Sequence, residues 1–281
     1  MFWLYNLYTI ACFLLVWGFA LVVWAKGGAR GESFASFKIM AYALPGLVAF
    51  GFRWIVEHKG FKKSFGLLGL RWPRPLSWLG VIGLPLALLI PGFLLPLLFG
   101  MARFDPTLSV FAEQLREAGL DPGQLHWYFW SKLGMSMSVG LLLLLPVGLL
   151  NEMGSRSYLI TLFSERFKPK LVMVLTGAFW ALVFLPFFTL DNPYGTWWGL
   201  LLYLAFAWSW AVLLAWLYNK AKSVLIPALA FLILDILNEA GSYWFVGSWV
   251  WTGAMGVFAV AVSTGLAVWA VITTKQVWVL E

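Results

Sequence analysis

The chain has few charged residues for its length and a large excess of apolar ones. Only 11% of its 281 residues are Asp, Glu, Lys or Arg, whereas 62% are hydrophobic. A soluble domain does not form with this balance, which is typical of a polytopic membrane protein. The net charge of +7 therefore does not indicate nucleic-acid binding, because Lys and Arg in short loops orient membrane proteins and contact lipid headgroups. We expect membrane lipids as partners and no nucleic acid.

Cysteine and histidine are scarce as well, and each shortage excludes a class of site. Cys12 is the only cysteine, so neither an intrachain disulfide nor a thiolate metal cluster can form. The two histidines, His58 and His126, fall on opposite sides of the membrane in the topology given below, so they cannot share a zinc ion. Asp235 is the only Asp within an expected span, which disfavours an aspartyl dyad. We predict no metal ion and no cofactor.

Long apolar runs are abundant, and their lengths predict about eight transmembrane helices, since a span needs about 20 mostly apolar residues. The first run lacks a basic segment before it, so we expect a retained helix and not a cleaved signal peptide. The fourth span is expected to continue as a helix to about residue 163. The predicted fold class is an all-α polytopic membrane helix bundle, one integral membrane domain over residues 1–281. The expected spans are residues 3–25, 36–56, 77–101, 128–152, 170–190, 196–218, 223–241 and 249–272.

The distribution of basic residues predicts the orientation of these spans. Of the 19 Lys and Arg residues, thirteen fall on one side of the topology and the remaining six on the other. The positive-inside rule makes the richer side cytoplasmic. We therefore predict a protein of the cytoplasmic membrane with both termini in the cytoplasm.

One loop on the outer side has a pattern of its own. Residues 104–127 carry Leu108, Phe111, Leu115 and Leu120 at helix-like spacing among charged residues. This pattern predicts a short amphipathic helix that lies on the outer membrane surface.

Three groups of residues interrupt the plain apolar pattern within the spans. Ionisable groups at membrane depth are costly and often mark functional sites, and an acid and a base four residues apart share a helix face. The groups are Asn151, Glu152 and Arg156 at the end of the fourth span, Trp180 and Phe184 in the fifth, and Asp235, Asn238 and Glu239 in the seventh.

Taken in order, these groups resemble the motifs of the CAAX-protease and bacteriocin-processing family of intramembrane metalloproteases, also called CPBP or Abi. That family has about eight helices and three motifs: Glu-Glu-x-x-x-Arg, Phe-x-x-x-His, and His-x-x-x-Asn two helices later. Residues 151–156 read Asn-Glu-Met-Gly-Ser-Arg. Residues 180–186 read Trp-Ala-Leu-Val-Phe-Leu-Pro, similar to the family's Trp-Ala-Leu-x-His-Leu-Pro. The resemblance covers about residues 125–245 and implies the CAAX-protease-like fold.

The departures from the family pattern fall on the positions that would hold and use the metal. The family's proposed base falls on Asn151, and its two histidines fall on Phe184 and Leu234. The retained motif positions are Glu152, Arg156 and Asn238. The resemblance therefore implies that no catalytic residue remains, and that zinc is expected only if the protein is an active protease.

The preferred interpretation is a pseudoprotease that binds a membrane-protein partner or a prenyl or other lipid-like ligand without cleaving it. We expect its groove to be lined by Glu152, Arg156, Trp180, Asp235 and Asn238. Two alternatives stay open. One is an active intramembrane endopeptidase that uses Glu152 and Asp235. The other is a small transporter whose polar path is lined by Glu152, Arg156, Asp235 and Glu239. The plainer interpretation of Glu152 and Arg156 is an ion pair that pins a helix end, and that of Trp180 and Phe184 is ordinary helix packing.

Overall fold

The computed structural model describes residues 2–30, 34–61, 69–192 and 194–277, most of which are helical. Short 3-10 helices occur at Gly28–Arg30, Pro75–Trp78 and Pro122–Gln124, and π-helical turns at Phe52–Val56, Ser136–Gly140 and Met153–Tyr158. Two short strands, β1 (Ala102–Phe104) and β2 (Phe245–Gly247), pair antiparallel. The α-helices are α1 (Phe2–Ala25), α2 (Phe34–Gly51), α4 (Leu79–Leu98), α5 (Ser109–Glu117), α6 (Leu125–Met135), α7 (Leu141–Glu152), α8 (Leu159–Ser164), α9 (Pro169–Val183), α10 (Leu185–Leu190), α11 (Trp198–Ala221), α12 (Leu225–Trp244) and α13 (Val257–Thr273).

These helices confirm the predicted all-α polytopic bundle. Within the described residues, 6 helical stretches are long and apolar enough to cross a membrane, and α9 and α13 are shorter apolar helices at the two remaining expected positions. The eighth expected span starts at residue 249, whereas α13 starts at Val257. The difference arises because β2 pairs with β1 and the following turn places Gly253 in the left-handed region at φ +81°.

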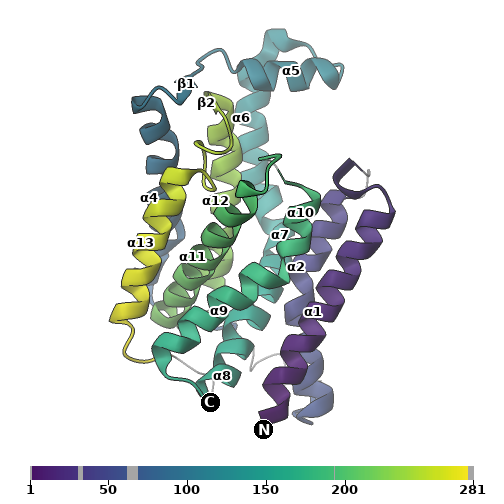
Figure 1. The fold of residues 1–281 in the computed structure, drawn as a ribbon. Helices are drawn as coiled ribbons and strands as arrows, with labels where there is room; N and C mark the ends of the chain where they lie inside the picture. The colour runs from purple at the N-terminus through teal and green to yellow at the C-terminus, as the bar shows by residue number, and fades with distance from the viewer. Residues whose placement is uncertain (1, 31–33, 62–68, 193, 278–281) are drawn as a thin grey trace.

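The fourth expected span is part of one continuous helical stretch of 43 residues, Pro122–Ser164. At 1.5 Å per residue this stretch is about 65 Å long, about twice the thickness of a bilayer's hydrocarbon core. It therefore extends beyond the membrane, and the prediction that it continues to about residue 163 is confirmed. Its first part, α6, stands at the top of Figure 1 beside α5.

The arrangement of the bundle follows from these crossings. In Figure 1, α4 and α13 lie on one side of the bundle, α1 and α2 lie on the other, and α9, α11 and α12 lie between them. The described chain begins and ends at the same end of the bundle (Figure 1), as an even number of crossings requires. Which end faces the cytoplasm stays a prediction from the basic residues.

The amphipathic segment after the third span forms α5, as expected, but its apolar face lies against protein. Leu108, Phe111 and Leu115 are buried in a small cluster with Phe129 of α6 and Tyr243 of α12. The protruding ends of α6 and α12 provide an apolar surface that this helix covers. The segment is therefore a cap on the end of the bundle away from the two termini, which the predicted topology makes the outer end.

Candidate functional site

The motif segment at residues 151–158 is fully inside the protein. Asn151 and Glu152 end α7, and the next six residues, Met153–Tyr158, form a π-helical turn in which every residue is buried. Such turns are rare, widen the helix locally and frequently occur at functional sites. Hydropathy and i, i+4 spacing do not distinguish a π-helical turn from an α-helix, so this turn could not be predicted from the sequence.

Glu152 and Arg156 form an ion pair that is sealed from solvent. Arg156 Nη1 lies 3.1 Å from Glu152 Oε1, and the two side chains are 0% and 1% exposed. The contact does not have hydrogen-bond geometry, and both carboxylate oxygens and all three guanidinium nitrogens lack a hydrogen-bond partner. We interpret the pair as mainly Coulombic, because the separation is short although the N–H groups do not point at the oxygens. Each charge depends on the other for compensation.

Aromatic rings fill the space beside this pair. The guanidinium carbon of Arg156 lies 5.8 Å from the ring centroid of Trp180, within the range of a cation–π contact. The Trp180 ring lies 5.1 Å from Phe184, and Phe184 lies 4.7 Å from Tyr42. Phe231 closes this aromatic cluster from α12, at 6.1 Å from Trp180 and 5.6 Å from Tyr42. The position that resembles a family histidine is therefore occupied by a packed ring.

One hydrogen bond within the motif segment and one from another part of the chain hold it in place. Ser155 Oγ donates to Asn151 Oδ1 at 3.0 Å. The Tyr158 hydroxyl donates to Glu57 Oε1 at 2.7 Å, and Glu57 also pairs with Arg53 at 3.3 Å. Arg53 lies in the second span and Glu57 directly follows it, and no local pattern in the sequence connects them with residue 158.

Helix α2 also packs backbone to backbone against the motif segment. A Cβ atom at Gly154 would lie 2.3 Å from the carbonyl carbon of Pro45, and one at Gly46 would lie 2.1 Å from the Leu150 carbonyl oxygen. Only glycine permits helices to approach this closely, as in small-residue contacts between membrane helices. The two glycines therefore determine how closely α2 packs against the segment that carries Glu152 and Arg156.

The predicted residues of the seventh span make their interactions with other elements. Leu234 is buried in the main core. Asn238 Oδ1 accepts a hydrogen bond from the Ala254 backbone N–H at 2.7 Å and so fixes the turn before α13. Asp235 is exposed, and the charged side chains that act on it are Lys38 and Glu239. The structure therefore brings Glu152, Arg156 and Trp180 together, and the described residues show no contact of Asn238 or Asp235 with the ion pair.

The donor atoms at the matched positions do not fit a zinc site. A catalytic zinc takes about three His or carboxylate ligands, whereas Phe184 and Leu234 carry no ligating atom and Asn151 Oδ1 accepts from Ser155. Across the described ranges of the chain, no three His, Cys, Asp or Glu side chains are grouped so that they could hold a metal ion. We derive no step through a metal at this site.

Comparison with known families supports the resemblance over part of the chain. Residues 133–237 match the family model described as type II CAAX prenyl endopeptidase Rce1-like. The matched stretch includes the ion pair, Trp180, Phe184 and Leu234, and it ends one residue before Asn238. The resemblance to the CAAX-protease family is thus confirmed for this stretch. No curated protein matches the chain.

Proposed function

We propose that this CAAX-protease-like membrane protein is non-catalytic and binds a membrane-protein partner or a lipid-like ligand. One observation carries the proposal. The motif segment keeps a fully buried Glu152–Arg156 pair, while the positions matched to the family's base and histidines hold Asn151, Phe184 and Leu234. A family member that keeps the framework of its site but lacks the reacting groups is suited to binding without hydrolysis.

The chemistry of Glu152 supports this proposal. Metal-assisted hydrolysis needs a metal-bound water and a base that can accept its proton. Glu152 is 1% exposed, and its carboxylate lies against Arg156 and not against a group that could bind water for attack. The pair neutralises itself and stabilises the turn between α7 and α8.

The two alternatives find less support. An endopeptidase based on Glu152 and Asp235 would need both carboxylates at one bond, but the charges that act on Asp235 are Lys38 and Glu239. A transporter would need a polar path from Arg156 toward Asp235. The contacts that lead outward from Arg156 run through the rings of the aromatic cluster. Packed rings are a poor lining for such a path.

Co-purification tests the proposal. The full chain, purified in mild detergent, should retain a membrane protein of intact length or an extractable lipid. Glu152→Gln should retain the same molecule, because binding does not require a proton acceptor. Glu117→Gln is the matched control, since Glu117 is an exposed acid outside the site. Processing of a partner that stops in Glu152→Gln but continues in Glu117→Gln would reject the proposal and support the protease.

Zinc content gives a second, independent test. Elemental analysis of the purified protein after mild dialysis should find far less than one zinc per chain, because a zinc site needs about three ligands. A content of about one zinc per chain would show that ligands outside the family positions assemble a site, and the non-catalytic interpretation would fail.

A further inference from the structure

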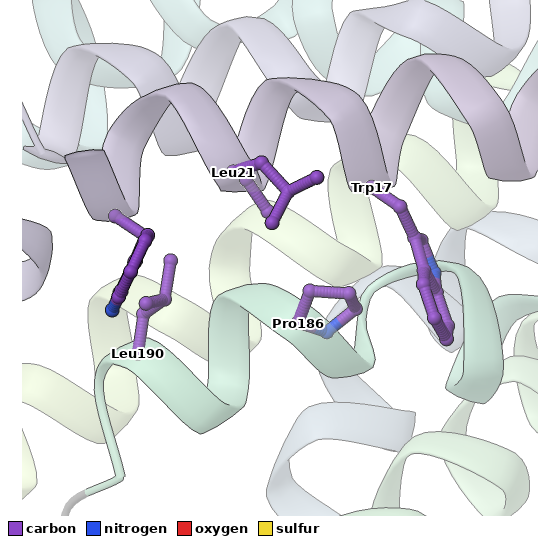
Figure 2. Close-up of a pocket in the computed structure, with 6 residues that line it drawn as sticks. Trp17, Leu21, Pro186 and Leu190 are labelled. Carbon is purple, nitrogen blue, oxygen red and sulfur yellow. The ribbon is translucent and has the colours of Figure 1, made fainter.

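A groove opens on the membrane-facing surface of the bundle, away from the buried ion pair. This lateral groove, of about 370 Å³, lies between α1 and α10 (Figure 2). Its volume is at the lower end of the usual range for ligand pockets, about 300–1,000 Å³. Leu21 and Trp24 at its rim are 66% and 67% exposed, so the groove is continuous with the surface that contacts lipid. Its lining is Trp17, Ala20, Leu21, Trp24, Pro186 and Leu190.

One wall of the lateral groove is fixed by a hydrogen bond between distant parts of the chain. Pro186 has no N–H, so the carbonyl of Leu182, four residues earlier, lacks its usual helical donor. The indole N–H of Trp17 donates to this carbonyl at 3.2 Å. In a hydrocarbon environment an unpaired carbonyl is costly, so this bond holds the Trp17 ring in place. The apolar wall is therefore preorganised and does not depend on a ligand to form.

One lysine at the outer end of the lateral groove is available to an anionic group. Leu190 is followed by Asp191, which pairs with Lys38 at 3.4 Å. Lys26 follows the α1 side of the groove, and the loop after it closes on Leu190, since a Cβ at Gly28 would lie 3.9 Å from Leu190 Cδ2. The described residues include no carboxylate partner for Lys26. Lys38 is compensated by Asp191 and also interacts with Asp235, so Lys26 is the cation at this end that can meet an anionic group.

We propose that the lateral groove binds one acyl chain of an anionic phospholipid, with its phosphate at the amino group of Lys26. The apolar lining suits a hydrocarbon chain, and the charge at the outer end complements a phosphate. A transmembrane helix, about 10–12 Å across with its side chains, is too wide for a hollow of this volume. This site is separate from the Glu152–Arg156 pair, so it does not depend on the proposed function.

Native mass spectrometry of the full chain with defined lipids tests the proposal. The probes are phosphatidylglycerol and phosphatidylcholine of the same acyl composition, compared in one detergent. Wild-type protein should bind phosphatidylglycerol about fivefold more tightly, the preference that one nearby lysine provides. Lys26→Gln should abolish that preference, and Leu21→Trp, which fills the groove, should reduce binding of both lipids.

Two control variants separate the groove from the rest of the surface. Leu14 lies on the same face of α1 two turns away and is 70% exposed, but it does not line the groove. Lys275 is exposed and follows α13 at the opposite end of the bundle. Leu14→Trp and Lys275→Gln should behave as wild type. Equal binding of the two lipids by wild type, or full lipid binding by a stably folded Leu21→Trp, would overturn the proposal. A chain dimer lost only in Leu21→Trp would also overturn it, because the occupant would be a second copy.

Discussion

Each end of the bundle contains an ion pair, but one pair is buried and the other is substantially exposed to solvent. At the motif segment, Arg156 and Glu152 are 3.1 Å apart and 0% and 1% exposed. At the outer end, Lys132 of α6 and Glu239 of α12 are 2.7 Å apart and 41% and 51% exposed. The outer pair is also hydrogen-bonded to Tyr243, whereas the inner pair has no hydrogen-bond partner. The two ion pairs have similar N–O distances. Because their exposure differs, removing one partner should lower the stability much more at the buried pair than at the exposed one.

Replacing Arg156 by Ala should have the largest effect on stability. Removal leaves the Glu152 carboxylate buried without a cation, which costs about 3–5 kcal/mol of stability in a dry site. A thermal melt in detergent should show a clearly lowered midpoint. A shift too small to resolve would mean that water reaches the pair.

A double replacement sharpens the same test. Glu152→Leu with Arg156→Met exchanges both charges for apolar groups of similar size, and such exchanges of buried pairs are often neutral or stabilising. We expect the double variant to melt well above Arg156→Ala. If both melt equally low, the loss comes from packing and not from an uncompensated charge.

Gly154→Ala should have the next largest effect, because it tests the close approach of α2. The added Cβ would lie 2.3 Å from the Pro45 carbonyl carbon, so one helix must move. Overpacking of this kind costs about 1–3 kcal/mol. Gly134→Ala is the control in the same helical stretch, where a Cβ meets nothing within 4 Å. Equal melting of the two variants would show that α2 shifts without cost.

Acidification should weaken the outer cap before it affects the buried core. Asp105 accepts hydrogen bonds from the side chains and backbone N–H groups of Thr107 and Ser109, and these bonds hold its pKa well below the usual range. A depressed folded-state pKa means that the stabilisation is complete above the unfolded pKa of about 4 and is lost as the pH falls below it.

Melting measured from neutral pH downward checks this effect. The melting temperature of the wild type should decrease once the pH drops below about 4. Asp105→Asn should remove part of that decrease, because its side chain does not titrate. Glu117→Gln, at an exposed acid of the same cap, should keep the wild-type pH profile. Identical profiles for all three proteins would show that Asp105 does not contribute.

The sequence predicted the parts of this structure that depend on local patterns. Apolar run lengths located the helices, and the spacing of Glu152 and Arg156 placed both on one face. Features joined across the chain had no local signal. Tyr158 bonds to Glu57 over 101 residues, and Trp17 bonds to Leu182 over 165 residues. The start predicted for the last helix, residue 249, was wrong because hydropathy does not detect the turn that Asn238 stabilises.

Glu239→Gln should have the smallest effect, and it completes the comparison of the two ends. The variant removes the charge of the outer pair but keeps the side-chain length and an oxygen that Tyr243 can contact. Because both partners are substantially exposed, water or Tyr243 can compensate Lys132, and pairs of this kind contribute about 0.2–1 kcal/mol. The midpoint should change little in low salt and less in high salt, since ions screen exposed charges. A decrease in the melting midpoint as large as that of Arg156→Ala, and unaffected by salt, would mean that the outer pair is effectively buried. Exposure would then not distinguish the two ends of the bundle.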